Sequence, residues 1–208
     1  MIFIKNYKVL CVFSHPDDEL IFGWPIFQEK QIEKHLICVV GGEKRLKSLN
    51  SVSKELGFTW ECLDIEDMQV EKHKEQIDKY LTLSIMKFNP DFIFTHNPYG
   101  EYNHPDHKVV FETVFNNNFA KNIIITNLLY SIKSSKWDRI SLIPNEYLKY
   151  YEYFLCKCFD NKKCSELSYI YKKNNVWTWK KKYEYLNSCK LFVIKKQNLT
   201  TGFFDEIS

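Results

Sequence analysis

Residues 9–13 form an uninterrupted apolar run, Val-Leu-Cys-Val-Phe, and residues 14–19 continue as Ser-His-Pro-Asp-Asp-Glu. A continuous apolar run is typical of a strand that is buried on both faces, as in parallel sheets covered by helices. Similar runs occupy residues 36–40 and 123–125, and residues 91–95, Asp-Phe-Ile-Phe-Thr, are predicted to form a further strand. The sequence therefore predicts a sheet whose first strand ends directly in an acidic, histidine-containing segment.

Helix-like patterns separate these strands. Apolar residues recur at helical spacing in residues 45–56 and 70–88. Gly57 follows the first of these segments, at the position where a C-cap glycine is common. We expect helices at residues 18–34, where Pro25 restricts the start, and at 45–56, 70–88 and 107–119, with a short strand at 60–63. Strands that alternate with helices predict a Rossmann-like, doubly wound α/β fold with a mostly parallel sheet.

The pattern is less regular after residue 133. A strand is expected within residues 147–159, helices at 165–173 and 179–188, and a final strand at 191–194. We expect these elements to form an irregular C-terminal extension. No repeat or Pro/Gly/Ser-rich linker divides the chain, so residues 1–208 are interpreted as one domain.

Composition excludes several classes of protein. The chain has 208 residues, of which 45% are hydrophobic and 16% aromatic, which excludes disordered and collagen-like chains. No apolar run approaches the roughly 20 residues of a membrane span. Lys5 and Lys8 interrupt the apolar N-terminus, so we interpret it as a strand and not as a signal peptide. Seven cysteines without a Cys-x-x-Cys motif fit a reducing, cytoplasmic location.

Charge is distributed unevenly. Residues 1–132 carry a net charge of −4, and residues 133–208 carry +7. The basic third could attract an anionic small-molecule substrate. Apart from Arg45 and Arg139, the basic residues are all lysines, whereas specific nucleic-acid recognition usually uses arginine, so nucleic-acid binding is not expected. The sequence leaves the oligomeric state open, homo-oligomers included.

Four of the six histidines lie in two short segments, residues 14–19 and 96–107. Each segment directly follows an expected strand. Because the carboxyl ends of parallel strands meet at one edge of a sheet, the two segments should converge where α/β proteins bind ligands. Imidazole and carboxylate groups both suit a borderline cation such as zinc.

Three residues are candidate metal ligands. His15 and Asp18 stand three residues apart across a proline-stiffened turn, and His107 can reach the same point from the second segment. Three protein ligands leave a fourth position for water, which is typical of catalytic zinc sites and lowers the pKa of that water.

The neighbouring polar residues supply candidate catalytic groups. Asp17 lies beside Asp18 and can act as a general base. His104 can stabilise an oxyanion or protonate a leaving amine. Asp106 can orient and charge-stabilise His104. Glu19 can hydrogen-bond to groups around the metal ligands without binding the metal itself.

The two segments resemble those of the PIG-L/LmbE-like zinc deacetylases, which carry His-Pro-Asp-Asp-Glu near the N-terminus and a later His-Pro-Asp-His. The resemblance covers roughly residues 8–115, about half the chain. Further matching positions are Gly42-Glu43, Arg45, Leu56-Gly57, Asp67 and Pro90-Asp91.

The resemblance implies a Rossmann-like fold, one zinc ion, and hydrolysis of the N-acetyl group of an N-acetylglucosamine-type sugar or conjugate. It implies the following roles: His15, Asp18 and His107 as zinc ligands, Asp17 as base, His104 with Asp106 at the tetrahedral intermediate, and Arg45 with Asp67 at sugar hydroxyls or a phosphate. Two positions depart from the family pattern. Ser48 replaces a frequent acid, and Tyr171-Lys172-Lys173, or Asn187-Ser188, stands where a Ser-Gln pair is common.

Other functions stay open at this stage. The same zinc site could hydrolyse another amide, such as an N-acyl or N-formyl group. Two histidines and one carboxylate also bind Fe(II) in non-haem oxygenases, so Fe(II) or another divalent metal is an alternative to zinc. Those oxygenases use His-x-Asp, whereas this chain has His-x-x-Asp. A polyanion-binding module is the third alternative.

Overall fold

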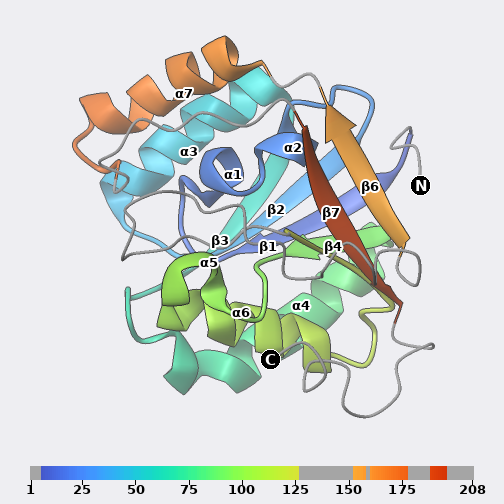
Figure 1. Cartoon of the computed structure of the whole chain (residues 1–208). Helices are drawn as coiled ribbons and strands as arrows, with labels where there is room; N and C mark the ends of the chain where they lie inside the picture. The colour runs from blue at the N-terminus through green and yellow to red at the C-terminus, as the bar shows by residue number, and fades with distance from the viewer. Residues whose placement is uncertain (1–5, 127–151, 158–159, 178–187, 196–208) are drawn as a thin grey trace.

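The computed structural model of the chain describes residues 6–126, 152–157, 160–177 and 188–195 (Figure 1). It contains a seven-stranded sheet in the order β3-β2-β1-β4-β5-β7-β6. The strands are β1 (Lys8–Phe13), β2 (Glu33–Val40), β3 (Thr59–Ile65), β4 (Phe92–Thr95), β5 (Asn122–Thr126), β6 (Glu152–Lys157) and β7 (Ser188–Lys195). The first five strands of the chain pair in parallel, whereas β7 is antiparallel to both β5 and β6. The predicted mostly parallel sheet is therefore confirmed.

Helices cover both faces of the sheet (Figure 1). They are α1 (Asp18–Ile21), α2 (Trp24–Phe27), α3 (Glu43–Leu56), α4 (Lys74–Phe88), α5 (Gly100–Asn103), α6 (Pro105–Asn116) and α7 (Asn161–Lys173), with a 3₁₀ turn, η1 (Val70–His73), before α4. Figure 1 shows α1, α2, α3 and α7 on one face and α4 and α6 on the other. This is the doubly wound arrangement that the alternating pattern predicts.

Strand β1 is buried on both faces because its side chains alternate between two hydrophobic cores. Val9, Cys11 and Phe13 belong to the core under α1–α3 and α7, and Leu10 and Val12 to the core over α4 and α6. The continuous apolar run of β1 is thus explained by its central place in the sheet.

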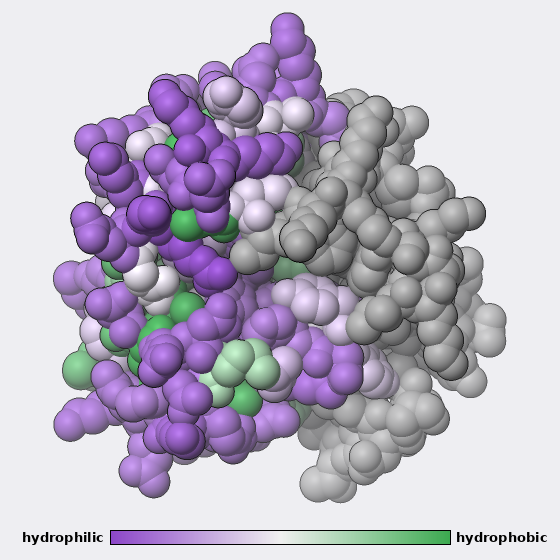
Figure 2. Space-filling view, turned by 90° about the vertical axis from the view of Figure 1, so that its left-hand side faces the viewer, coloured by the Kyte–Doolittle hydropathy of each residue, from purple (hydrophilic) through white to green (hydrophobic). Residues whose placement is uncertain are grey.

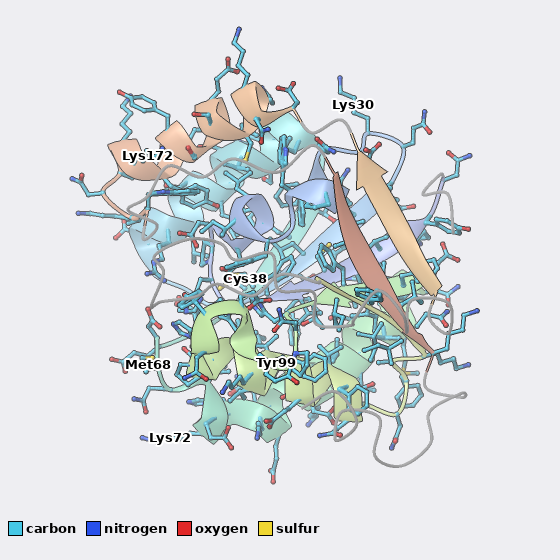
Figure 3. All side chains as sticks on the ribbon, in the orientation of Figure 1. Lys30, Cys38, Met68, Lys72, Tyr99 and Lys172 are labelled. Atoms are coloured by element: carbon cyan, nitrogen blue, oxygen red, sulfur yellow. The ribbon has the colours of Figure 1, made fainter. Side chains whose placement is uncertain are left out.

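Several lysine side chains lie at the surface, outside these cores. Figure 3 shows Cys38 of β2 in the middle of the molecule, whereas Lys30, Lys72 and Lys172 project from its periphery. Where the described residues form the face at the left of Figure 1, it is mostly hydrophilic, with small hydrophobic areas between the polar side chains (Figure 2). None of the helices within the described ranges is long and apolar enough to span a membrane.

Two expected elements differ from the structure or fall outside it. The helix expected over residues 18–34 is two short helices, α1 and α2, with Gly23 between them. A Cβ atom at Gly23 would lie 2.8 Å from the Glu19 carbonyl oxygen, so the close turn requires glycine. The helix expected at 179–188 lies outside the described residues, apart from Ser188 in β7.

The end of α3 provides a test of this local structure. Gly57 caps α3 in the left-handed conformation, with φ of 69°, and a Cβ atom added there would meet no atom within 4 Å. We therefore expect Gly57→Ala to lower the free energy of unfolding by about 1–2 kcal/mol through backbone strain alone. Gly57→Asn should cost less, because Asn89 ends α4 in the same conformation. Urea denaturation of both variants measures the difference, and equal losses would contradict this explanation.

Candidate active site

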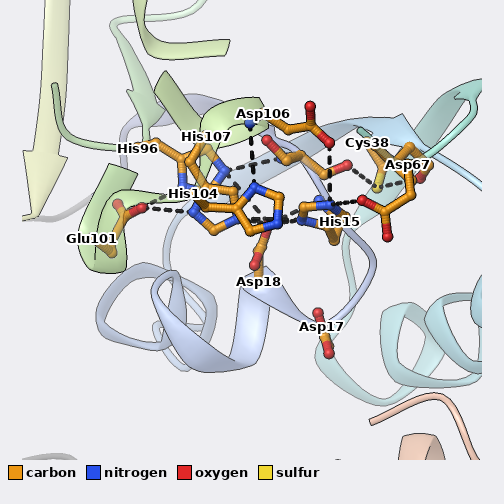
Figure 4. A network of polar contacts seen from close by, with 12 residues as sticks. His15, Asp17, Asp18, Cys38, Asp67, His96, Glu101, His104, Asp106 and His107 are labelled. Atoms are coloured by element: carbon orange, nitrogen blue, oxygen red, sulfur yellow. Dashed lines mark hydrogen bonds and ion pairs between the residues drawn. The ribbon is translucent and has the colours of Figure 1, made fainter. Parts of the chain in front are cut away.

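The parallel pairing of β1 with β4 brings the two histidine segments together. Val12 pairs with Thr95, so residues 14–19 and 96–107 leave the same edge of the sheet. A buried hydrogen bond joins the two segments directly: the Ser14 backbone N–H donates to Nε2 of His96 at 3.0 Å. Figure 4 shows the imidazole rings from both segments gathered around Asp18.

The three expected metal ligands converge on one point. His15 Nδ1 lies 3.2 Å from His107 Nε2 and 3.5 Å from Asp18 Oδ2, and the latter two atoms are 3.7 Å apart. All three residues are buried. In a tetrahedral zinc site with bonds near 2.0–2.2 Å, neighbouring ligand atoms stand about 3.3–3.6 Å apart. The observed separations fit such a site closely.

Glu101 fixes the orientation of the ring of His107. Its Oε2 atom lies 2.8 Å from His107 Nδ1 and 3.1 Å from His96 Nδ1, and its Oε1 atom accepts the Asn97 backbone N–H at 3.0 Å. His107 therefore directs Nε2 toward Asp18. Burial is the main cause that lowers the pKa of His107 to about 4, so this ring is neutral and can bind a metal. Glu101 is not among the site residues expected from the sequence, although an acid within a histidine-rich segment is a signal for this role.

His96 lies near the same point but is already engaged. Its Nε2 atom is 3.4 Å from Asp18 Oδ2, so Asp18, His96 and His107 are also close enough to hold an ion. A backbone N–H can only donate, and the bond from Ser14 therefore occupies the lone pair of His96 Nε2. His96 instead links the two histidine segments through Ser14 and contacts Glu101 through Nδ1.

Two further carboxylates lie near the other ring nitrogen of His15, Nε2. His15 Nε2 is 3.1 Å from Asp67 Oδ1 and 3.8 Å from Asp106 Oδ2. These three residues form another group with metal-ligand spacing, as do His15, His104 and His107. An acid on the far nitrogen of a ligating histidine fixes its ring and its tautomer, so Asp67 and Asp106 act here as supports for His15.

The cluster carries a surplus of negative charge. Five of its carboxylates are buried: Asp17, Asp18, Glu19, Glu101 and Asp106. Burial lowers the pKa of His15, but hydrogen bonds to the Asp106, Asp18 and Asp67 carboxylates offset this and hold that pKa well above its usual value. A divalent cation among these nitrogen and oxygen donors would neutralise part of the charge, and the residues therefore fit a metal ion.

Asp17 adopts a strained backbone beside the candidate ligands. Its φ of 115° lies in the left-handed region, which costs a non-glycine residue about 1–3 kcal/mol and is common at functional sites. Its side chain is buried, and burial together with the charges of Asp18 and Glu19 raises its pKa well above the usual value. In Figure 4 its carboxylate lies apart from the imidazole rings, beyond Asp18.

Both the backbone and the side-chain charge of Asp106 act on His104. His104 Nδ1 accepts the backbone N–H of Asp106 at 3.2 Å, which places the proton of the neutral ring on Nε2. Burial and the nearby charge of His15 lower the pKa of His104, and the neutral form is therefore favoured. The Asp106 carboxylate accepts the Met68 backbone N–H at 2.8 Å and faces His15, and its charge raises the pKa of His104 by less than burial lowers it.

The two expected substrate-binding residues meet at the edge of the cluster. Arg45, in the first turn of α3, lies 3.5 Å from Asp67. The hydrogen bond to His15 is the main cause that lowers the pKa of Asp67 to about 2. Both side chains remain partly exposed, at 20% and 44%, and so present a cation and an anion next to the buried ligands.

Known proteins share this fold. Teicoplanin deacetylase Orf2, in its zinc-inhibited form, aligns with a TM-score of 0.65 and 9% identity over 92% of this chain and all of its own. N,N'-diacetylchitobiose deacetylase from Pyrococcus horikoshii aligns with a TM-score of 0.55 and 18% identity over 96% of this chain and 88% of its own. At these identities the likeness is one of fold.

The sequence comparisons define the family. An uncharacterised protein of Acanthamoeba polyphaga mimivirus is 28% identical over 134 residues, which is 54% of this chain and only 60% of that relative's length. The model of the GlcNAc-PI de-N-acetylase family, PIG-L, matches residues 10–117, a range that contains both histidine segments. The chain belongs to this family, which confirms the resemblance seen in the sequence.

The contacts of Glu101 lead to a prediction about metal affinity. Glu101→Gln should weaken zinc binding about 10- to 100-fold, because one carboxylate oxygen becomes an NH2 group, which cannot accept either from the two imidazoles or from the Asn97 backbone N–H. Glu112→Gln is the control, since Glu112 is exposed and pairs with Lys74. Competition with a chromophoric chelator measures both affinities, and equal zinc affinity in the two variants would contradict this role of Glu101.

Proposed function

We propose that this protein is a zinc-dependent hydrolase that removes the N-acetyl group from an N-acetylglucosamine-type sugar or sugar conjugate, with residues 1–208 acting as one domain. The convergence of His15, Asp18 and His107 beside Asp17 carries the proposal. Membership of a de-N-acetylase family and the deacetylase names of proteins with the same fold support it.

Three atoms would hold the metal: His15 Nδ1, Asp18 Oδ2 and His107 Nε2. Zinc held there supplies Lewis-acid polarisation of water and of the amide carbonyl. Glu101 and Asp67 fix the two imidazole rings through their other nitrogens. The ligand set thus has the outer support that metal-binding histidines require.

Asp17 and His104 have different roles in the proposed reaction. Asp17 accepts a proton from the attacking water as its oxygen bonds to the amide carbon. His104, with its proton on Nε2, donates a hydrogen bond to the oxyanion that develops on the carbonyl oxygen. The proton returns from Asp17 to the amine nitrogen as the C–N bond breaks, which gives acetate and the free amino sugar.

Arg45 and Asp67 are our candidates for contacts with the sugar. Arg45 can donate to hydroxyl or phosphate oxygens, and Asp67 can accept from hydroxyl groups. Mass-spectrometric screening of the zinc-loaded protein against N-acetyl sugars, nucleotide sugars and N-acetylglucosaminyl conjugates tests the proposal. We expect a loss of one acetyl group from at least one N-acetylglucosamine compound. Turnover of N-formyl or other N-acyl amides alone would contradict the proposed substrate class.

Adjacent carboxylates should respond differently to the same change. Asp17→Asn should retain zinc and lower the turnover number by about 10²–10⁴-fold or more, because an amide cannot take up a proton. Asp18→Asn should mainly weaken zinc binding, because a neutral amide is a poor ligand. Metal content and deacetylation at excess zinc are measured for both variants. Loss of zinc from Asp17→Asn, with zinc and activity retained in Asp18→Asn, would reverse the assignment.

Substrate charge is a separate prediction. The surplus of lysine after residue 132, together with Arg45 at the cluster, favours a phosphate-bearing or otherwise anionic N-acetyl sugar. We expect a higher kcat/KM for a phosphorylated sugar than for its neutral counterpart, and a difference that shrinks as salt is raised. Equal values at all salt concentrations would contradict this preference.

A further inference from the structure

Helix α7 lies outside residues 10–117, which the family model matches, yet it contacts the first histidine segment, residues 14–19. Tyr171, in its last turns, is fully buried and donates its O–H to Glu19 Oε1 at 2.6 Å. The two residues are 152 positions apart in the sequence. This length is typical of a hydrogen bond from a hydroxyl to a carboxylate, at about 2.5–2.7 Å. The C-terminal part of the chain therefore contacts the His-Pro-Asp-Asp-Glu segment directly.

Glu19 bonds to Asp17 as well as to Tyr171. Its second oxygen, Oε2, accepts the Asp17 backbone N–H at 2.9 Å. Asp17 sits at φ 115°, a conformation that persists only where the surroundings hold it. The hydrogen bond that Asp17 N–H donates to Glu19 is one such restraint, and it acts on the peptide group next to the Asp17 Cα atom.

We propose that Tyr171 is a positioning residue for Asp17 and that it acts through Glu19. The exposed fractions of Tyr171, Glu19 and Asp17 are 0%, 0% and 1%, so water cannot easily replace a lost partner. Without the Tyr171 hydroxyl, Glu19 Oε1 would lose its donor in a dry interior, and the carboxylate would turn toward another one. The Asp17 backbone N–H would then lose this restraint, while the Asp17 carbonyl stays bonded to the Leu20 and Ile21 N–H groups. The kinetic consequence rests on the proposed function, whereas the structural consequence does not.

A neighbouring contact provides a matched control. Asn174, which caps the same helix, donates to Ser48 Oγ on α3 at 2.8 Å. Asn174→Ala removes a hydrogen bond between α7 and the N-terminal half without touching Glu19. Tyr171→Phe removes the hydroxyl and keeps the buried ring. Any effect of loosening α7 as a whole should appear in both variants, whereas an effect through Glu19 should appear only in Tyr171→Phe.

The first experiment needs no activity. Hydrogen–deuterium exchange of the full chain without added metal is followed in peptides covering residues 15–22. Tyr171→Phe should raise exchange there at least several-fold, and Asn174→Ala should leave it as in the unmodified protein. No change in Tyr171→Phe, or an equal rise in both variants, would overturn the proposal. If Tyr171→Phe does not fold, Glu19→Gln makes the same test from the other end of the contact.

The second experiment reads the effect on turnover. Tyr171→Phe should lower kcat about tenfold with KM and zinc affinity unchanged, the size expected for one lost hydrogen bond to a charged group. Adding Tyr171→Phe to Glu19→Gln should cause no further loss, because both changes break one connection. Fully additive losses, or a change in KM alone, would overturn the proposal. If the unmodified chain deacetylates no substrate, the proposed function fails, and the exchange experiment decides the role of Tyr171 by itself.

Discussion

The parallel pairing of β1 with β4 is the constraint on which the site of this protein depends. It directs two segments that lie about 80 residues apart to one edge of the sheet, where the Ser14–His96 hydrogen bond joins them. β1 can hold this central position because its side chains are apolar on both faces. Any shift in its register would separate His15 and Asp18 from His107, so the core of the sheet and the geometry of the site are determined together.

The second constraint is electrostatic. Five buried carboxylates near four histidines would be costly to bury without compensation. The protein compensates in part with hydrogen bonds: Glu101 accepts from two imidazoles and a backbone N–H, and Glu19 accepts from Tyr171 and Asp17. The surplus charge around Asp18 and His15 remains to be balanced by a cation. Metal binding should therefore also stabilise the fold, because the unfolded chain has no comparable site.

Much of this arrangement could be predicted from the sequence because it is encoded locally. The apolar runs of β1, β2 and β4 and the Gly57 cap follow from short-range patterns, and strand order then brings His15, Asp18 and His107 together. The support of these residues could not be predicted in the same way. Glu101 bonds to His107 from a non-helical position in α5, because its own φ is 53°. The Asp106 carboxylate bonds to Met68, which lies in the loop after β3. Tyr171 meets Glu19 through the packing of α7, which no local pattern encodes.

Zinc K-edge anomalous diffraction from crystals of the zinc-loaded protein tests the central claim most directly, because it locates the metal independently of any assay. The geometry predicts one strong peak within about 2.0–2.2 Å of His15 Nδ1, Asp18 Oδ2 and His107 Nε2. A peak held by Asp18, His96 and His107, or by His15, Asp67 and Asp106, would contradict the ligand set and the roles derived from it.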